Sequence, residues 1–285
     1  MDSSLFFYQN ENKQYYMNKN ILITGATGGI GLKLIDILYN LGANLILISH
    51  DENKLKSKLE KYLTIDSSIK INSNRKTEEI NSQIQYEIIN LENPIEINEK
   101  FHSIMKKFKG KLDILFICHG QYNFNSIKEC DVKTFDSIMN INVRSVFHIL
   151  SLAVPFLKIT KGNCVIISSL ESFIPVKNGF LNSTTKAMIN SMVKNAALEL
   201  ASFGVRINAV APGITDTEHR NDIINVEIKN KDSMFPLGKK ILQPENIVDT
   251  ILFLGSDEAS FITGEIIQND NGYGLNHDLS FTHDI

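Results

Sequence analysis

Short apolar runs rich in β-branched residues alternate along the chain with longer stretches in which apolar side chains recur at helical spacing. This pattern predicts helices separated by strands near residues 20–24, 44–49, 85–90, 112–118, 163–168, 205–210 and 265–269. Because the strands are apolar at nearly every position, both faces of their sheet must be covered, which is typical of a parallel sheet between two layers of helices. The sequence therefore predicts an α/β protein.

The alternation continues from residue 20 to about 274 without a break in composition, which indicates a single domain. Residues 1–19 are polar and aromatic without a period and are expected to form an appended arm, and residues 275–285 a short tail. Residues 64–84 form a polar insertion that is expected to be a solvated loop. Residues 216–243 interrupt the pattern and fit a flap over a cleft, with a surface excursion as the alternative.

Composition narrows the classes of function. The chain has 285 residues, of which 43% are hydrophobic and 21% charged, so a disordered chain is excluded. The net charge of −3 leaves no basic surface for nucleic acid or an anionic membrane. Cys118, Cys130 and Cys164 are spaced neither as a disulfide framework nor as a metal site. No apolar run reaches the roughly 20 residues of a membrane span, and no secretory signal begins the chain, so a cytoplasmic protein without metal is expected.

A glycine-rich turn follows the first predicted strand. Gly25, Gly29 and Gly31 have the spacing that permits a tight turn, close approach of the backbone to a pyrophosphate and close packing of the next helix. The helix that follows offers its first N–H groups to the phosphate charge. A nucleoside triphosphatase is disfavoured because no Gly-Lys-Ser/Thr sequence ends the turn. The turn therefore predicts a dinucleotide site.

With this turn, the sequence resembles the short-chain dehydrogenase/reductase family over about residues 20–274. The resemblance implies a Rossmann-type, doubly wound parallel sheet of seven strands and NAD(P)-dependent hydride transfer between a small carbonyl compound and a secondary alcohol, closest to 3-oxoacyl reductases. A homodimer or homotetramer is implied by the same analogy. The matching stretches are Thr24–Gly31, Phe135–Val143, Val165–Ser169, Lys186–Val193, Ala197–Ala201, Val205–Gly213 and Phe253–Gly264.

The resemblance also implies which residues meet the cofactor. No carboxylate stands where the second strand ends, at Ser49 and His50, and this favours NADP(H) over NAD(H), because an acidic side chain there repels the 2′-phosphate. The implied cofactor residues are Gly25, Thr27, Gly29, Ile30, Gly31, Ser49, His50, Asn90, Leu91, Gly120, Lys186, Pro212, Gly213, Thr215 and Thr217.

The family's catalytic residues carry over with one departure. The resemblance implies Ser169 to polarise the carbonyl, Lys186 to hold the nicotinamide ribose and Asn142 to order a water molecule. The family's tyrosine belongs four residues before Lys186, where this chain has Asn182. An amide donates a hydrogen bond but not a proton, so two hypotheses stand: an oxidoreductase of weak or unusual activity, or an inactive protein that binds NADP(H) as a sensor or scaffold. His119 is interpreted as a turn residue rather than a substitute acid.

Overall fold

The computed structural model describes residues 15–68, 84–217, 235–238 and 241–275. Within them seven strands form one parallel sheet in the order β3-β2-β1-β4-β5-β6-β7, which confirms the α/β fold and the seven-stranded sheet. The strands are β1 (Asn20–Thr24), β2 (Asn44–Ser49), β3 (Ile84–Ile88), β4 (Ile114–Ile117), β5 (Asn163–Ile167), β6 (Arg206–Pro212) and β7 (Ile266–Asn269).

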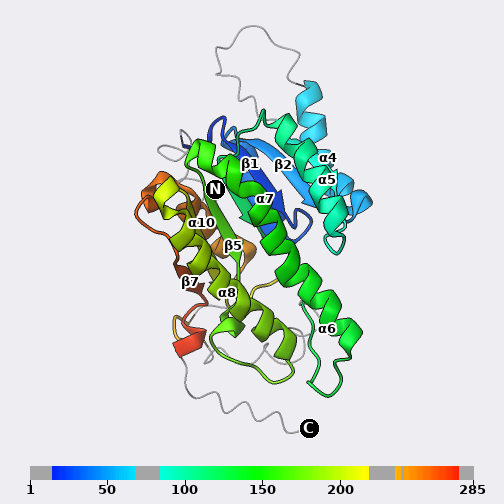
Figure 1. Ribbon diagram of the computed structural model, residues 1–285, viewed down its shortest axis with the longest axis vertical. Helices are drawn as coiled ribbons and strands as arrows, with labels where there is room; N and C mark the ends of the chain where they lie inside the picture. Colours follow the sequence, from blue (N-terminus) through cyan, green and yellow to red (C-terminus); the bar gives the residue numbers. More distant parts are fainter. Residues whose placement is uncertain (1–14, 69–83, 218–234, 239–240, 276–285) are drawn as a thin grey trace.

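Helices connect the strands (Figure 1). The α-helices are α3 (Gly29–Asn40), α4 (Glu52–Ser68), α5 (Pro94–Lys107), α6 (Val132–Met139), α7 (Ser145–Thr160), α8 (Phe180–Leu200) and α10 (Pro244–Gly255). The short helices are the π-helical turn η1 (Asn140–Arg144) and the 3-10 turns η2 (Leu170–Ser172), η3 (Ala201–Phe203), η5 (Asp257–Ala259) and η6 (Tyr273–Leu275).

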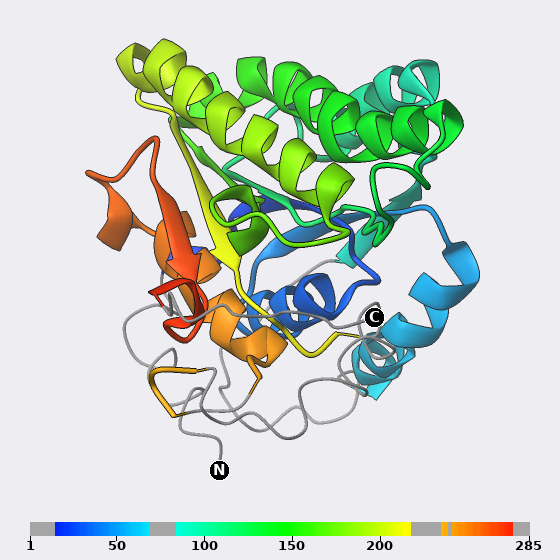
Figure 2. The same ribbon diagram turned by 90° about the horizontal axis from the view of Figure 1, so that it is seen from below.

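The helices cover the sheet on both faces, with α5, α7 and α8 on one side and α3, α4 and α10 on the other (Figure 2). Neighbouring strand residues point into opposite layers: Leu22 packs in the core under α5, α7 and α8, whereas Ile21 and Ile23 pack in the core under α3 and α10. This is why the strands are apolar at consecutive positions.

The order of the strands reverses between β1 and β4. The chain starts at the centre of the sheet, adds β2 and β3 on one side, and returns to β4 on the other. In open α/β sheets, the carboxyl ends of the strands at such a reversal form the ligand crevice. Gly25, which follows β1, and His119 and Gly120, which follow β4, lie at this place.

Three expected segments compare with the structure as follows. Tyr16, at the end of the expected N-terminal arm, is fully buried, and its hydroxyl donates to the backbone oxygen of Leu252. Residues 64–68 of the expected polar loop continue α4. Residues 1–14, 69–83 and 276–285, and most of the expected flap at 218–234 and 239–240, lie outside the described residues.

One described stretch meets the length and the apolar composition of a membrane-spanning helix, and these are the only two criteria that it meets. It runs through α6, η1 and α7 (Val132–Thr160). Ile149, Ala153 and Leu157 of α7 are fully buried against the sheet, as in a core helix of a globular domain. The stretch is therefore weak evidence for a membrane span.

Candidate active site

The glycine-rich turn between β1 and α3 is packed too closely for side chains. Gly25 has a φ of +69°, and a Cβ there would lie 2.7 Å from the backbone nitrogen of His119. A Cβ on Gly31 would lie 2.3 Å from the backbone oxygen of Gly25. The N-cap of α3 is Gly28, which has no side chain to accept the first amide groups of the helix. The turn thus presents bare backbone, as a bound pyrophosphate requires.

The segment after β6 lies across this turn. A Cβ on Gly29 would lie 3.2 Å from Cγ2 of Thr217, so the two segments are in contact. Thr215 is buried and its hydroxyl donates to the backbone oxygen of Gly213 at 3.1 Å. Pro212 ends β6 and is also buried. The structure therefore brings the expected residues of the 212–217 segment together with the glycine-rich turn.

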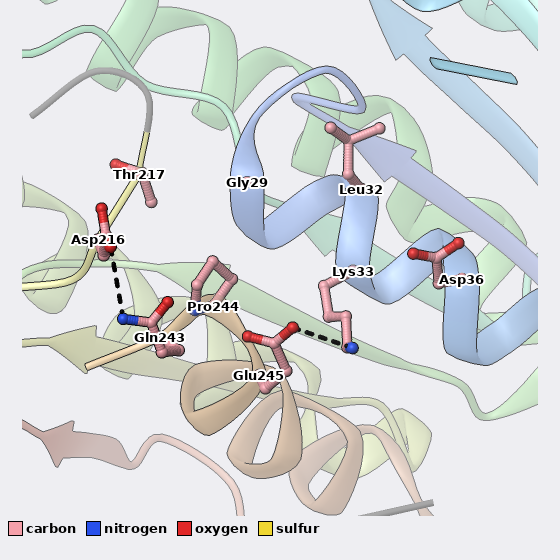
Figure 3. A pocket seen from close by; sticks show the side chains of 9 residues that line it. All are labelled: Gly29, Leu32, Lys33, Asp36, Asp216, Thr217, Gln243, Pro244 and Glu245. Atoms are coloured by element: carbon pink, nitrogen blue, oxygen red, sulfur yellow. Dashed lines mark hydrogen bonds and ion pairs between the residues drawn. The ribbon is translucent and has the colours of Figure 1, made fainter. Parts of the chain in front are cut away.

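A pocket of about 390 Å³ opens beside the same contact (Figure 3). Gly29 and Thr217 line it, and an ion pair of Lys33 with Glu245, at 2.9 Å, closes one side. Neither Ser169 nor Lys186 is among its lining residues. The pocket is thus lined by two of the expected cofactor residues and by none of the expected catalytic residues.

The carboxyl end of β2 presents no acidic side chain to a ligand. Ser49 is buried, and its Oγ exchanges hydrogen bonds with the backbone N–H and oxygen of Asp51, at 3.1 and 3.2 Å. The Asp51 carboxylate caps α4 by accepting from the N–H of Lys54 at 2.9 Å. His50 is exposed. The nearest carboxylate in the sequence is therefore used to begin a helix.

Asn90 and Leu91 follow β3. Asn90 is exposed, and its Oδ1 accepts the N–H of Glu92 at 3.0 Å. A carbonyl oxygen has a second lone pair, so this bond leaves Asn90 able to accept another from an adenine amino group. Leu91 is half-buried and packs against the core.

Helix α8 carries Asn182 and Lys186 one turn apart, and both are buried. The Lys186 ammonium donates to the backbone oxygen of Ile167, at the end of β5, at 2.8 Å. A Cβ on Gly120 would lie 3.4 Å from Nζ of Lys186 and 3.6 Å from Oδ1 of Asn142. The structure thus brings Lys186, Asn142 and Gly120 together, and glycine keeps the space beside the ammonium open.

Burial changes the charge of Lys186. Desolvation lowers its pKa from 10.5 to about 8, partly opposed by the charge of Glu171. The lysine therefore stays mostly protonated at neutral pH and loses its proton in mildly alkaline solution.

Asn142 lies in the π-helical turn η1, a widened helical turn that is common at functional sites. Its side chain fixes the loop after β4, because Oδ1 accepts the N–H of Gln121 at 2.7 Å and Nδ2 donates to the Gln121 oxygen at 2.9 Å. Nδ2 also contacts Oγ1 of Thr185 at 3.3 Å. Asn142 thereby links η1, this loop and α8.

Two serines follow β5, and they have different surroundings. Ser168 is buried and donates to Oδ1 of Asn190 at 2.5 Å, which gives it a structural role. Ser169 is half-buried and begins η2, where its Oγ accepts the N–H of Glu171 at 3.2 Å. Its hydroxyl hydrogen remains able to donate to a ligand.

Glu171, which the sequence pattern did not single out, lies beside Asn182. It is 9% exposed, and its carboxylate accepts from Nδ2 of Asn182 at 2.5 Å and from the hydroxyl of Tyr122 at 3.3 Å. The one sign in the sequence was an acidic residue two positions after Ser169, next to the end of a buried strand.

His119 lies in the core. Its Nδ1 pairs with Oγ1 of Thr24 and its Nε2 with Oγ of Ser145, both at 2.7 Å. Desolvation, with the nearby charge of Lys186, lowers its pKa from 6.5 to about 3. The ring therefore stays neutral at physiological pH, where it links β1, β4 and α7 and holds no proton to donate as an imidazolium.

No three His, Cys, Asp or Glu side chains gather as metal ligands within the described residues. Burial raises the pKa of the Cys118 thiol to about 12, which keeps it protonated.

Comparison with known sequences places these features in a family. A profile described as enoyl-(acyl carrier protein) reductase matches residues 25–274. A 3α-hydroxysteroid dehydrogenase of Mediterraneibacter gnavus is 30% identical over 254 residues, 89% of this chain and 96% of the relative. A 3-oxoacyl-[acyl-carrier-protein] reductase of Thermotoga maritima is 28% identical over 89% of this chain and 97% of its own. A tropinone reductase homolog of Arabidopsis thaliana is 29% identical over 90% of this chain and 93% of the relative.

Solved structures show the same fold. A short-chain dehydrogenase/reductase of Mycobacterium ulcerans superposes with a TM-score of 0.81 at 23% identity, covering 92% of this chain and 91% of the other. One from Brucella melitensis superposes with a TM-score of 0.78 at 25% identity, covering 91% and 98%. The matches extend from the glycine-rich turn through Ser169, Asn182 and Lys186 to β7, and this chain therefore belongs to the short-chain dehydrogenase/reductase family of NAD(P)-dependent oxidoreductases.

Proposed function

We propose that this protein transfers a hydride between a nicotinamide cofactor and a small carbonyl compound or secondary alcohol, in the manner of 3-oxoacyl reductases. The observation that carries the proposal is the position of Lys186, whose buried ammonium bonds the end of β5 beside Asn142 and the open space at Gly120. Ser169 follows that strand end by two residues. A dinucleotide fits the bare backbone of the glycine-rich turn and the 212–217 segment that lies across it.

The residues divide the work as follows. The bound nicotinamide supplies or accepts the hydride. Lys186 holds the nicotinamide ribose through its ammonium, and the hydroxyl of Ser169 donates to the substrate oxygen on which negative charge develops. Asn142 fixes the loop beside Lys186 and orders water there. Asn182 stands where the family's tyrosine acts as proton donor, and its amide can donate a hydrogen bond to the same oxygen but no proton.

NADP(H) is the proposed cofactor. The absence of an acidic side chain at Ser49 and the use of the Asp51 carboxylate as the cap of α4 both support it, because neither opposes a 2′-phosphate. NAD(H) is the alternative.

The experiment has two stages. Fluorescence titration with NADPH and with NADH measures cofactor binding. Oxidation of NADPH is then followed with a 3-oxoacyl thioester, tropinone and a 3-ketosteroid, which are compounds suggested by the names of the relatives. Binding of NADPH with turnover of at least one carbonyl compound is expected, and failure to bind either cofactor contradicts the proposal.

A second candidate is a cofactor-binding protein without turnover, and the amide at position 182 is the observation that favours it. Losing a positioned general acid costs on the order of 10²–10⁴ in rate. If the wild type binds NADPH without turnover and the Asn182→Tyr variant is active, this candidate is correct.

We also propose a cytoplasmic location and a homodimer or homotetramer. The three cysteines are free thiols, which suits a reducing compartment. Large apolar side chains exposed on α7 and α8, such as Phe147 (59% exposed) and Leu198 (80%), suit a subunit contact. Analytical ultracentrifugation measures the mass, and a monomer at micromolar concentration contradicts the oligomer.

A further inference from the structure

We propose that Glu171 is the catalytic acid and base of this site, giving a proton to the carbonyl oxygen in reduction and taking it back in oxidation. The inference rests on the proposed function and supplies the proton that Asn182 cannot give.

The first support is where the carboxyl lies. Glutamates are seldom buried as far as Glu171, which is 9% exposed, unless they are paired or have a functional role. Its backbone N–H donates to Oγ of Ser169 at 3.2 Å and its Oε2 accepts from Nδ2 of Asn182 at 2.5 Å. The carboxyl of Glu171 therefore contacts Asn182, and its backbone contacts Ser169; the proposed function places both of these side chains at the substrate oxygen.

The second support is that neighbouring elements accommodate the carboxyl. A Cβ on Gly179, just before α8, would lie 3.2 Å from Oε2 of Glu171, so glycine leaves the carboxyl its space. From the loop after β4, the hydroxyl of Tyr122 donates to Oε1 at 3.3 Å. Two segments, the loop after β4 and the start of α8, thus surround one carboxyl group.

The third support is the combined length of the Asn182 and Glu171 side chains. An asparagine side chain is shorter than the tyrosine of the family by most of an aromatic ring. The amide nitrogen of Asn182 holds the Glu171 oxygen at its end, so the pair extends further from α8 than the amide alone. Glu171, on a neighbouring element, thereby supplies a carboxyl oxygen at the end of the shorter side chain.

Charged and titratable groups face Glu171 from neighbouring elements. Tyr122 faces it from the loop after β4, and Lys186 interacts with its charge from α8. Beyond Leu170, the Asp270 carboxyl accepts backbone N–H groups of the turn after β7. The charge of Glu171 thus acts on Lys186, whose pKa it raises.

The step balances as follows. The hydride forms a new C–H bond at the carbonyl carbon, which is reduced as the cofactor is oxidised. The O–H bond of the protonated Glu171 carboxyl breaks while the O–H bond of the product alcohol forms. The carboxylate then takes a proton from water. Oxidation of the alcohol follows the same path in reverse, with the carboxylate as base.

The test compares wild type with Glu171→Gln and Glu171→Ala, using the carbonyl compound that the wild type reduces and NADPH. Glutamine keeps the size of the side chain and one acceptor oxygen but has no acidic proton. We expect kcat to fall by about 10²–10⁴ in both variants. The decline of the wild-type reduction rate with rising pH should disappear in Glu171→Gln, and formate should partly restore the rate of Glu171→Ala. The dissociation constant for NADPH and the melting temperature should stay near those of the wild type.

Glu99→Gln is the matched control, because Glu99 is exposed on α5 and should change neither rate nor pH profile. If the wild type is active and Glu171→Gln is equally active, the catalytic role of Glu171 is overturned and the proposed function stands. A Glu171 variant that loses NADPH binding or thermal stability together with activity also overturns the catalytic role, because such a loss indicates a structural role. A wild type that binds NADPH and reduces no carbonyl compound overturns both this inference and the proposed function.

Discussion

At the scale of single residues, the chemistry depends on side chains whose partners are distant in sequence. Asn182 and Lys186 are recognisable from their spacing, and α8 places them as that spacing requires. Glu171 was not recognisable, because the sequence does not show that its carboxyl meets the amide of Asn182, 11 residues away, and the phenol of Tyr122, 49 residues away. Local spacing predicts which residues share a helix face, whereas contacts between elements need the fold.

Cofactor choice is a prediction at this scale. Replacing Ser49 with Asp puts a carboxylate at the end of β2, where it repels a 2′-phosphate and can accept hydrogen bonds from a 2′-hydroxyl. The dissociation constant for NADPH should rise at least about tenfold, which is about 1.4 kcal/mol, while NADH binding tightens. Fluorescence titration with both cofactors measures the ratio.

Ser49→Ala is the control for this prediction, because it removes the hydroxyl that bonds Asp51 without adding charge. It should leave the preference between the two cofactors nearly unchanged. An unaltered preference in Ser49→Asp would show that this strand end does not meet the adenosine ribose.

At the scale of elements, apolar patterning predicted all seven strands with small errors at their ends. The strand at β4 was predicted to start too early. The apolar run begins at Leu112, which is fully buried, but hydrogen bonding to the neighbouring strands begins at Ile114. An apolar pattern predicts which residues are buried, but not which of them form hydrogen bonds with a neighbouring strand. It therefore predicts the ends of strands less accurately than their existence.

The link that His119 makes between elements could not be predicted in the same way. The sequence predicted only a turn residue at His119. The structure shows that His119 joins Thr24, 95 residues away, to Ser145, 26 residues away. A single imidazole therefore ties β1 to the start of α7.

Acid sensitivity follows from this link. The native pKa of His119 is about 3 against 6.5 in an unfolded chain, so the unfolded state binds more protons between these values. The free energy of unfolding should fall as the pH drops through this window, by up to about 1.4 kcal/mol per pH unit from this group. Replacing His119 with Asn removes that contribution, at a cost of about 1–3 kcal/mol at pH 7 for the hydroxyls left unpaired.

Urea unfolding at several pH values measures the effect as the difference between wild type and His119→Asn. The difference should narrow as the pH falls from 6.5 toward 3. A difference that stays constant over this range would show that the pKa of His119 is the same in the native and unfolded states.

At the scale of the whole molecule, the start of the described chain is part of the core. Tyr16 was expected to belong to an appended arm, because the aromatic residues of this polar segment follow no period. It is instead fully buried, and its hydroxyl donates to an oxygen of α10 that is 236 residues away in sequence. A Cβ on Gly255 would lie 3.1 Å from that hydroxyl and 2.9 Å from the ring of Phe116 on β4, so Tyr16 fills a space between helix and sheet.

Removing this ring should therefore destabilise the whole domain. We expect Tyr16→Ala to lower the free energy of unfolding by about 3–5 kcal/mol, as large-to-small changes in a core do, and Tyr16→Phe by about 1 kcal/mol for the lost hydrogen bond. The chain has no Trp, so urea unfolding is best followed by circular dichroism. Met17→Ala is the control, since Met17 is 37% exposed and should cost far less. Equal stability of Tyr16→Ala and Met17→Ala would mean that the segment is an appendage after all.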